Sequence, residues 1–215
     1  MTKINRLKKD GIGNLHLLLD FDRTISVSKH GKDRVSQWHA MRQHLTADEQ
    51  KQCENLFRIY RPLEVSGQLT VEQSRDWNSA ELNLMVKFSL DLNAVEQNLI
   101  NHLTLRPGVV ELFKFCETHE VPIVILSSGI KNVIDMFLRS YGIKSTLTIA
   151  TELEVNDKGI LVGWKKSTLV HNYNKRESAH SELKQIRLKQ PNCILVGDSL
   201  HDAAMTNGDD NHVAK

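Results

Sequence analysis

The stretch LHLLLDFDRT, residues 15–24, decides the fold that this chain is expected to adopt. Its first half, Leu15–Leu19, is an apolar run that is too short for a helix and ends in an acidic motif. A short apolar run of this kind is typical of a strand that is buried on both faces of a parallel sheet. The carboxylates of Asp20 and Asp22 would follow the end of this strand, where open parallel sheets bind their ligands. We therefore expect an α/β fold with its functional groups at that edge.

Helices and strands are predicted to alternate from Pro107 to the end of the chain. The expected strands span residues 121–126, 146–150 and 193–196. The expected helices span residues 109–118, 130–140 and 177–189, and a further helix starts at residue 200. Residues 153–155 and 160–162 flank the turn sequence NDKG, which predicts a β-hairpin. Strands that alternate with helices indicate a parallel sheet with right-handed crossovers.

A helical region interrupts this pattern after the first strand. Its apolar residues recur at helical spacing, and capping boxes are predicted at residues 46–49 and 70–73. The polar, glycine-containing stretch at residues 28–36 suits a hinge into this region. We therefore expect two units, a core made of residues 1–29 and 105–215 and a helical domain made of residues 30–104.

Composition excludes several classes of protein. The 215 residues are 40% hydrophobic and 25% charged, with a net charge of +2, so disordered, collagen-like and coiled-coil chains do not fit. The near-neutral charge gives no reason to expect nucleic acid as a partner. No apolar run approaches the roughly 18 residues that cross a membrane, and the N-terminus does not resemble a signal peptide. We expect a soluble, cytoplasmic protein, with a monomer favoured, whose Cys53, Cys116 and Cys193 are reduced, buried thiols.

The pair Asp20 and Asp22 is the first chemical signal in the sequence. Two carboxylates at the end of a buried strand are costly unless something pairs with them. A hard cation such as Mg²⁺ would do so through oxygen ligands. For an isolated pair, however, two carboxylates that cap the next turn are the more common arrangement.

Three more polar segments follow or precede predicted elements. Ser127-Ser128-Gly129 comes after the strand at 121–126 and opens a helix, so it could bind an anion or could simply cap that helix. Lys175 lies just before a predicted helix and carries no signal by itself. The segment GDSLHD, residues 197–202, follows the strand at 193–196, and its two aspartates could be ligands or caps.

The order of these segments resembles the haloacid dehalogenase superfamily. The pattern is Asp-x-Asp-x-Thr, then serine, then lysine, then Gly-Asp-x-x-x-Asp, and it runs from Leu15 to the end of the chain. The resemblance implies a Rossmann-like core with a parallel sheet, and it implies that the helical domain is a cap over the carboxyl ends of the strands.

The resemblance also implies roles for the first three polar residues. Asp20 would be the nucleophile that attacks phosphorus and forms an aspartyl-phosphate. Asp22 would protonate the leaving oxygen and then activate water, and Thr24 would help to orient the acid. Superfamily members that lack an acid at the position of Asp22 are usually not phosphatases, so this residue favours a phosphatase.

A metal and phosphate site is implied in the same way. The cofactor would be Mg²⁺, and its site would be formed by Asp20, the backbone carbonyl of Asp22, and Asp198. Asp202 would lie beside it, where it would orient Lys175 or metal-bound water. Ser127 and Lys175 would hold the phosphoryl oxygens, and Lys175 would also offset the charge of Asp20.

A closer resemblance is to the pyrimidine 5′-nucleotidase family, also called cytosolic 5′-nucleotidase III. The residues that carry it are 126–133, 159–165, 170–175, 60–65 and 69–72. It implies that Glu64 hydrogen-bonds the nucleobase, although residue chemistry alone would favour a solvated carboxylate. The family's cap serine has no clean counterpart, since Ser79 is near the right place but the spacing around Trp77 differs. The implied substrate-binding set is Glu64, Ser127, Ser128 and Lys175.

These resemblances predict a Mg²⁺-dependent 5′-nucleotidase that acts on nucleoside monophosphates, pyrimidine nucleotides first. One alternative is a phosphatase for another small phosphomonoester, such as phosphoserine. A second alternative is a catalytically weak nucleotide-binding protein, because the chain stops thirteen residues after Asp202 and its C-terminus looks short for the family. The strand at 193–196 would then be an exposed edge, and residues 212–215 would form barely an element.

Overall fold

The computed structural model describes residues 2–29, 35–176, 181–206 and 212–214. Its helices are α1 (Lys3–Asp10), α2 (Gln37–Arg42), α3 (Ala47–Val65), α4 (Val71–Lys87), α5 (Leu92–His102), α6 (Val109–Thr118), α7 (Lys131–Ser140) and α8 (Ser181–Lys189). Its strands are β1 (Leu15–Leu19), β2 (Ser26–Ser28), β3 (Leu103–Leu105), β4 (Ile123–Ile130), β5 (Leu147–Thr151), β6 (Leu153–Val155), β7 (Leu161–Trp164), β8 (Asn192–Val196) and β9 (His212–Ala214). Short 3₁₀ helices lie at η1 (Ile12–Asn14), η2 (Lys166–Thr168) and η4 (Leu200–Thr206).

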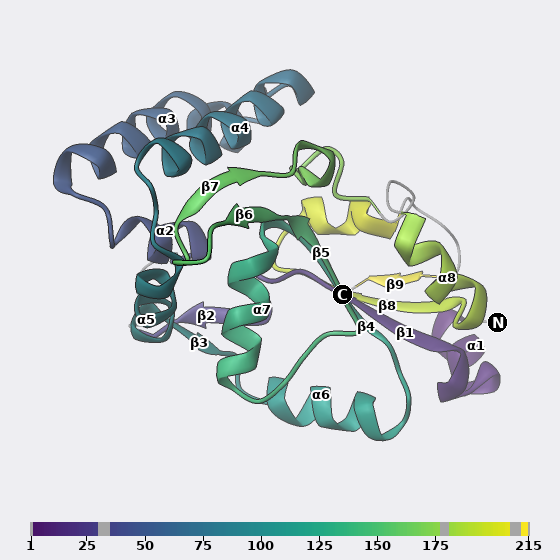
Figure 1. The fold of residues 1–215 in the computed structure, drawn as a ribbon. Helices are drawn as coiled ribbons and strands as arrows, with labels where there is room; N and C mark the ends of the chain where they lie inside the picture. Colours follow the sequence, from purple (N-terminus) through teal and green to yellow (C-terminus); the bar gives the residue numbers. More distant parts are fainter. Residues whose placement is uncertain (1, 30–34, 177–180, 207–211, 215) are drawn as a thin grey trace.

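Five parallel strands form the central sheet, in the order β5-β4-β1-β8-β9 (Figure 1). β1 is the middle strand, and Leu17 pairs with Ile123 on one side and with Ile194 on the other. The chain therefore builds the sheet outward from β1, first on one side and then on the other. This Rossmann-like order confirms the expected fold class.

Both faces of the sheet are covered, which explains why four of the five residues of β1 are leucine. Leu17 and Leu19 point into a large hydrophobic cluster with residues of α6 and α7. Leu18 points the opposite way, into a smaller cluster that contains Leu183 of α8 and Met205. Successive side chains of a strand alternate between faces, so a strand covered on both sides is mostly apolar on both. The polar residue of β1, His16, is buried with its Nδ1 2.7 Å from the Gln190 carbonyl oxygen.

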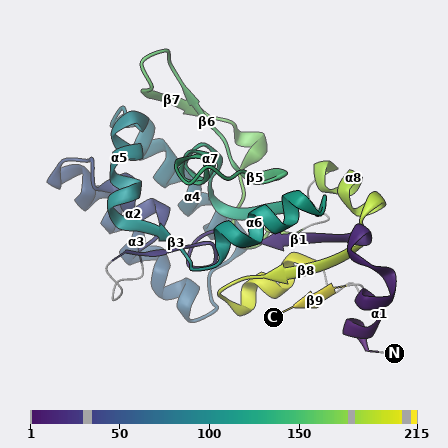
Figure 2. The same ribbon diagram turned by 90° about the horizontal axis from the view of Figure 1, so that it is seen from below.

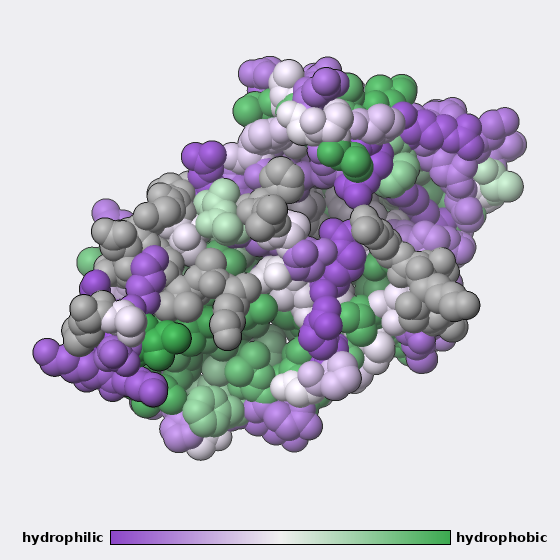
Figure 3. Space-filling view, turned by 180° about the vertical axis from the view of Figure 1, so that it is seen from behind, coloured by the Kyte–Doolittle hydropathy of each residue, from purple (hydrophilic) through white to green (hydrophobic). Residues whose placement is uncertain are grey.

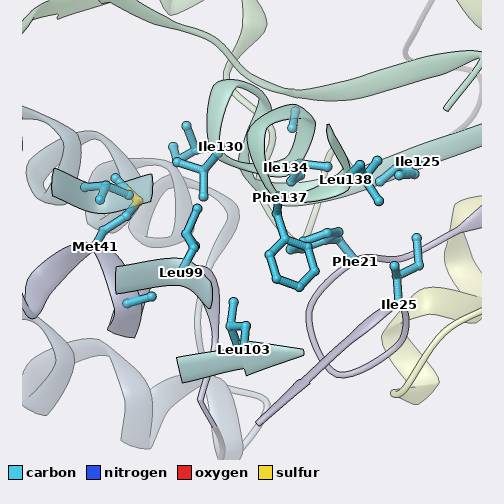
Figure 4. Packing of buried hydrophobic residues seen from close by; sticks show 14 of the residues in the cluster. Phe21, Ile25, Met41, Leu99, Leu103, Ile125, Ile130, Ile134, Phe137 and Leu138 are labelled. Atoms are coloured by element: carbon cyan, nitrogen blue, oxygen red, sulfur yellow. The ribbon is translucent and has the colours of Figure 1, made fainter. Parts of the chain in front are cut away.

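The large cluster continues from the sheet into the helices that follow β2. The rings of Phe21 and Phe137 meet edge to face, with centroids 5.6 Å apart. Figure 4 shows Met41 of α2 and Leu99 of α5 near Ile130, at the end of β4. The sheet and these helices therefore share buried apolar contacts close to the functional edge.

Residues 37–102 form four helices, α2 to α5, which we call the helical segment. α3 and α4 lie side by side, away from the sheet, while α2 packs with α5 (Figures 1 and 2). Both predicted capping boxes are present, with Thr46 and Glu49 starting α3 and Thr70 and Gln73 starting α4. Each box satisfies backbone N–H groups that would otherwise lack a partner at the helix start.

The helical segment leaves and rejoins the core at one place. β2 and β3 pair antiparallel, with Ser26 opposite Leu105 and Ser28 opposite Leu103. This two-stranded ribbon was not predicted, and neither was α1. Residues 30–34, which belong to the hinge expected at 28–36, lie outside the described residues.

The C-terminal part of the core differs from expectation in two ways. β9 pairs with β8 in parallel, so the strand at 193–196 is not the edge of the sheet, and residues 212–214 do form an element. The residues after 200 form the 3₁₀ helix η4 instead of the predicted α-helix. The predicted hairpin is present as β6 and β7, and of the predicted helix at 177–189 the described part is α8.

Surface and interior chemistry agree with an ordinary globular protein. Cys53, Cys116 and Cys193 are buried, as expected of structural thiols. Figure 3 shows hydrophilic residues over much of the side that carries α3 and α4, while hydrophobic residues gather on the lower part of the same view. Within the ranges that the structure describes, no helix is both long enough and apolar enough to span a membrane.

Candidate active site

Asp20 directly follows the central strand and is only 5% exposed. Its Oδ2 accepts a hydrogen bond from Thr24 Oγ1 at 3.0 Å, and its Oδ1 accepts one from Lys175 Nζ at 2.5 Å. The backbone N–H of Asp20 donates to the Val196 carbonyl of β8, which fixes the start of the loop. A buried carboxylate is thus held in a defined orientation at the edge of the sheet.

Lys175 lies between two carboxylates. Its Nζ donates to Asp20 Oδ1 and, at 2.7 Å, to Asp202 Oδ1. Burial lowers the pKa of Lys175, but the two carboxylates outweigh burial, and the pKa ends above its ordinary value. The lysine is therefore a fixed positive charge beside Asp20. Ser199 holds the other oxygen of Asp202 through its backbone N–H and its hydroxyl, at 3.0 and 2.9 Å.

Three carboxylates converge at the end of β1 and β8. Oxygens of Asp20, Asp198 and Asp202 lie within 4.8 Å of one another. Gly197 precedes two of them in the turn after β8, and a Cβ at this position would overlap the Asp202 side chain. Arg23 Nε donates to Asp198 Oδ2 at 2.6 Å. Clustered carboxylate oxygens suit a hard divalent cation, so the donor set fits Mg²⁺.

Asp22 points away from this cluster and toward the start of the helical segment. The backbone N–H of Gln37 donates to Asp22 Oδ1 at 2.8 Å, and Gln37 Nε2 donates to Asp22 Oδ2 at 3.1 Å. Burial raises the pKa of Asp22 to about 6, although both hydrogen bonds oppose the rise. A carboxyl group with this pKa can give up or accept a proton near neutral pH. The Asp22 carboxylate therefore suits acid–base work better than metal binding.

Residues 127–130, which we call the serine segment, do not form the helix start that was predicted. β4 continues through residues 127–129 to Ile130, and α7 begins only at Lys131. Ser127 is only 2% exposed, and its Oγ accepts a hydrogen bond from the backbone N–H of Gly129 at 3.1 Å. The N–H of Ile130 donates to Gln37 Oε1 at 2.7 Å. These two backbone donors already have partners, so the segment is not an open helix N-terminus.

A cleft of about 730 Å³ connects these groups with the helical segment. Its sequence-predicted lining residues are Asp20, Asp22, Glu64, Ser127, Ser128, Lys175, Asp198 and Asp202. Thr24 does not line the cleft, and its hydroxyl bonds to Asp20 instead of Asp22, the acid that it was expected to orient. The structure therefore brings all predicted site residues to one cavity or to its wall.

Glu64 lies at the end of the cleft that the helical segment forms. Its Oε1 accepts a hydrogen bond from Asn172 Nδ2 at 2.6 Å, and its Oε2 pairs with Arg61. The Tyr173 hydroxyl donates to the Leu69 carbonyl in the turn between α3 and α4. The loop that carries Lys175 is thus attached to the helical segment next to the cleft.

Aromatic residues of α3 and α4 form one wall. Trp77 and Phe57 line the cleft, and Tyr60 stacks on Trp77 with centroids 5.7 Å apart and 15° between the ring planes. Phe57 and Trp77 therefore present aromatic rings to the cleft, whereas Tyr60 packs against Trp77 and is not among the described residues that line it. On α4 the cleft is lined by Trp77, Asn78 and Glu81, and Ser79 is not among the lining residues that the structure describes.

Three contributors to the site were not predicted. Gln37 holds Asp22, Asn172 holds Glu64, and Arg106 donates to the backbone carbonyls of Arg23 and Thr24 in the loop that follows β1. Arg23 has a φ of 65°, an unusual conformation for a residue with a side chain, and the Arg106 contacts stabilise it. Gln37 and Arg106 are far from the motifs in sequence, and no local pattern distinguishes them from surface residues.

Comparison with known proteins gives a consistent result. The sequence model of the pyrimidine 5′-nucleotidase (UMPH-1) family matches residues 24–214, so the match starts just after Asp22. Among curated relatives, 7-methylguanosine phosphate-specific 5′-nucleotidase A of Xenopus laevis is 28% identical over 218 residues, which covers 96% of this chain and 75% of the relative.

Solved structures support the same fold. Cytosolic 5′-nucleotidase IIIB bound to cytidine superposes with a TM-score of 0.81 at 23% identity, covering 99% of this chain and 74% of that one. A substrate-bound phosphoserine phosphatase superposes with a TM-score of 0.62 at 16% identity, covering 93% and 84%. These neighbours show that the chain has the fold of the haloacid dehalogenase phosphatases.

Proposed function

This chain belongs to the pyrimidine 5′-nucleotidase family, and on that premise we propose that it hydrolyses nucleoside 5′-monophosphates through an aspartyl-phosphate on Asp20. The family and its curated relatives are 5′-nucleotidases, so the chain is a phosphoric monoester hydrolase. The observation that carries the mechanism is the environment of Asp20. This carboxylate is buried between Lys175 and Thr24 at the wall of a cleft, next to two further aspartates.

In the first step, an Asp20 oxygen forms a bond to phosphorus while the bond from phosphorus to the 5′ oxygen breaks. Asp22 gives its proton to that leaving oxygen, so the product is a neutral nucleoside. Lys175 stabilises the negative charge on the phosphoryl oxygens, together with Ser127 and Ser128. Support for these roles comes from the shared cleft and from the position of Lys175 beside Asp20.

In the second step, water attacks the phosphorus of the aspartyl-phosphate. Asp22, now ionised, takes a proton from the water, and the bond between phosphorus and Asp20 breaks to release inorganic phosphate. Asp22 is thereby returned to its protonated form, and Asp20 to a carboxylate. A pKa of about 6 for Asp22 suits a group that must act first as an acid and then as a base.

The proposed cofactor is Mg²⁺. Asp20, Asp198 and the backbone carbonyl of Asp22 would hold it, with Asp202 beside them. Bound Mg²⁺ would offset the charge of the carboxylates and of the phosphoryl group. The convergence of three carboxylates supports this assignment, because Lys175 and Arg23 offset only part of their negative charge and a bound cation would offset the rest.

The helical region at residues 30–104 is proposed as a cap that selects the substrate. We propose pyrimidine nucleoside monophosphates as substrates, with Glu64 reading the base and Trp77 offering it an aromatic surface. 7-methylguanosine monophosphate is a second candidate, because the Xenopus laevis relative is named for it. Methylation of guanosine at N7 places a positive charge on the base, and an aromatic face beside a carboxylate is also suited to a cation.

A substrate panel on purified protein tests the proposed function. Phosphate release would be measured from cytidine, uridine and 7-methylguanosine monophosphates and from phosphoserine, each with Mg²⁺ and with chelator. Mg²⁺-dependent release that favours one of the nucleotides by at least tenfold in kcat/KM supports the proposal.

Two outcomes would contradict it. Equal or better hydrolysis of phosphoserine would indicate the other phosphatase, for which the structural likeness shows only the fold. Nucleotide binding without phosphate release would indicate the catalytically weak binding protein. Calorimetric titration of cytidine monophosphate in parallel with the panel separates these two results.

A further inference from the structure

We propose that Gln37 is a positioning residue that orients Asp22 for proton transfer to the leaving oxygen. The inference rests on the proposed function and deepens it. It gives a chemical task to the first residue of the helical segment, which lies between Asp22 and the serine segment.

Three polar groups of Gln37 contact Asp22 and the end of β4. Its backbone N–H and its Nε2 each donate to one oxygen of Asp22, at 2.8 and 3.1 Å. Its Oε1 accepts the backbone N–H of Ile130 at 2.7 Å. The two donors hold both oxygens of the carboxylate, so the group cannot rotate without losing a hydrogen bond.

Because Gln37 is buried, losing these hydrogen bonds would be costly. The Gln37 residue is 0% exposed, so an unpaired amide here would lose its hydrogen bonds without regaining them from water. Gly129 supplies the space, because a Cβ at this position would overlap the Gln37 amide. Core packing alone would not require an uncharged amide here whose nitrogen contacts Asp22 and whose oxygen contacts the backbone at Ile130.

Helix capping alone does not account for the geometry. The Ser36 side chain, at the N-cap position of α2, makes no capping hydrogen bond, and Asp22 accepts the first backbone N–H of the helix instead. A cap needs one oxygen, whereas Gln37 engages both oxygens of Asp22. The second hydrogen bond comes from the side chain and fixes the plane of the carboxyl group.

The orientation of the Asp22 carboxyl group matters most for substrates whose leaving oxygen must be protonated. In the first step Asp22 loses a proton to the ester oxygen as the P–O bond breaks and the Asp20–phosphorus bond forms. A nucleoside alkoxide is a poor leaving group and needs that proton. A p-nitrophenolate leaves readily without it. A misoriented Asp22 should therefore slow nucleotide cleavage much more than cleavage of p-nitrophenyl phosphate.

The test measures kcat/KM for cytidine monophosphate and for p-nitrophenyl phosphate, since this quantity reports the steps up to the first irreversible one. Two variants separate the contacts. Gln37→Met removes all side-chain hydrogen bonds at similar length. Gln37→Glu keeps an acceptor for Ile130 but replaces the donor to Asp22 with a second carboxylate.

Both variants are expected to lower kcat/KM for the nucleotide by roughly 10- to 100-fold, the loss that hydrogen bonds to a charged group typically produce. For p-nitrophenyl phosphate the loss should stay within about threefold. Asp22→Asn provides the reference for complete loss of the acid, and Gln97→Met, an exposed position on α5, provides the matched control with unchanged activity.

The outcomes distinguish the inference from its premise. Equal losses on both substrates would mean that Gln37 supports only the fold, and wild-type rates in Gln37→Glu would mean that the Ile130 contact is the one that matters; either result overturns the inference. If the wild-type protein releases no phosphate from either substrate in Mg²⁺, the proposed function itself is wrong.

Discussion

Asp20 is the residue on which the proposed chemistry depends most directly. Asp20→Asn should abolish phosphate release from nucleotides while leaving the fold intact, because an amide is a poor nucleophile and a weaker ligand for a cation. The remaining rate should be below about one part in a thousand. Steady-state phosphate release with Mg²⁺ measures it.

Asp157→Asn is the matched control for that change, because Asp157 is exposed in the turn between β6 and β7. It should retain full activity and stability. Circular dichroism of both variants checks the fold. Substantial turnover in a folded Asp20→Asn protein would exclude the aspartyl-phosphate mechanism.

Glu64 tests whether substrate selection and chemistry are separate. Glu64→Gln should lower kcat/KM for cytidine and uridine monophosphates by about ten- to a hundredfold, since a hydrogen bond to a charged group is worth roughly 1.5–3 kcal/mol. Hydrolysis of p-nitrophenyl phosphate should change by no more than a few-fold. Glu96→Gln, an exposed position on α5, is the control.

A parallel loss on both substrates would give Glu64 a different task. The Asn172 hydrogen bond attaches Glu64 to the loop that carries Lys175. Glu64 would then act by holding this loop, not by reading the base. No change on any substrate would leave it without a functional role.

Among single residues, those that stand in recognisable motifs could be predicted from the sequence. Residues that act by positioning another side chain could not. Asp20, Asp22, Lys175 and Asp198 stand in recognisable motifs, and the structure places them around one cleft. Gln37 contacts Asp22 only because α2 packs against the serine segment, and such a contact between distant segments has no local signature.

Among the elements, the end of β4 leaves no space for a side chain at Gly129. Gly129→Ala should lower nucleotide hydrolysis by roughly tenfold or more and cost about 1–3 kcal/mol in the free energy of unfolding, because the new Cβ would displace the buried Gln37 amide. Steady-state kinetics and chemical denaturation measure the two effects.

Gly13→Ala is the matched control, since a Cβ at Gly13 meets no atom within 4 Å. Its free energy of unfolding should change by no more than about 0.5 kcal/mol. If Gly129→Ala behaves like this control, the Gln37 side chain moves aside freely and its contacts are weak.

Elements with strong local patterns were predicted well. α6 is found at its predicted residues, and β1, β8 and the β6–β7 hairpin lie within a few residues of expectation. β2 and β3 were missed because each is three residues long and its partner lies on the other side of the helical segment. The error at Ser127 has a similar cause, since β4 pairs with β5 at Leu126 and again at Ile130, and the helix begins only after this second pairing.

For the whole molecule, the carboxylate cluster predicts a link between ligand binding and stability. Mg²⁺ with beryllium fluoride, which mimics a phosphoryl group, should raise the melting temperature by roughly 5–10 °C at a hundredfold excess over Kd. The reason is that the complex binds only where Asp20, Lys175 and the cluster are assembled. Thermal unfolding followed by fluorescence measures the shift.

Mg²⁺ alone and beryllium fluoride alone are the controls, and each should give a much smaller shift. Asp198→Asn should reduce the combined effect, because it removes one carboxylate of the cluster. An undiminished shift in that variant, or no shift in the wild-type protein, would contradict the proposed metal and phosphoryl site.

The antiparallel pairing of Ser26 with Leu105 bears on how such enzymes diversify. The chain leaves the core along β2 and returns along the neighbouring β3. Lengthening the segment between these two strands therefore raises the entropic cost of loop closure only slowly. Evolution could therefore replace this segment with one of a different size while the sheet and Asp20 keep their positions. Each replacement segment would have to form a contact equivalent to the Gln37–Asp22 hydrogen bond before a new substrate is hydrolysed at the full rate.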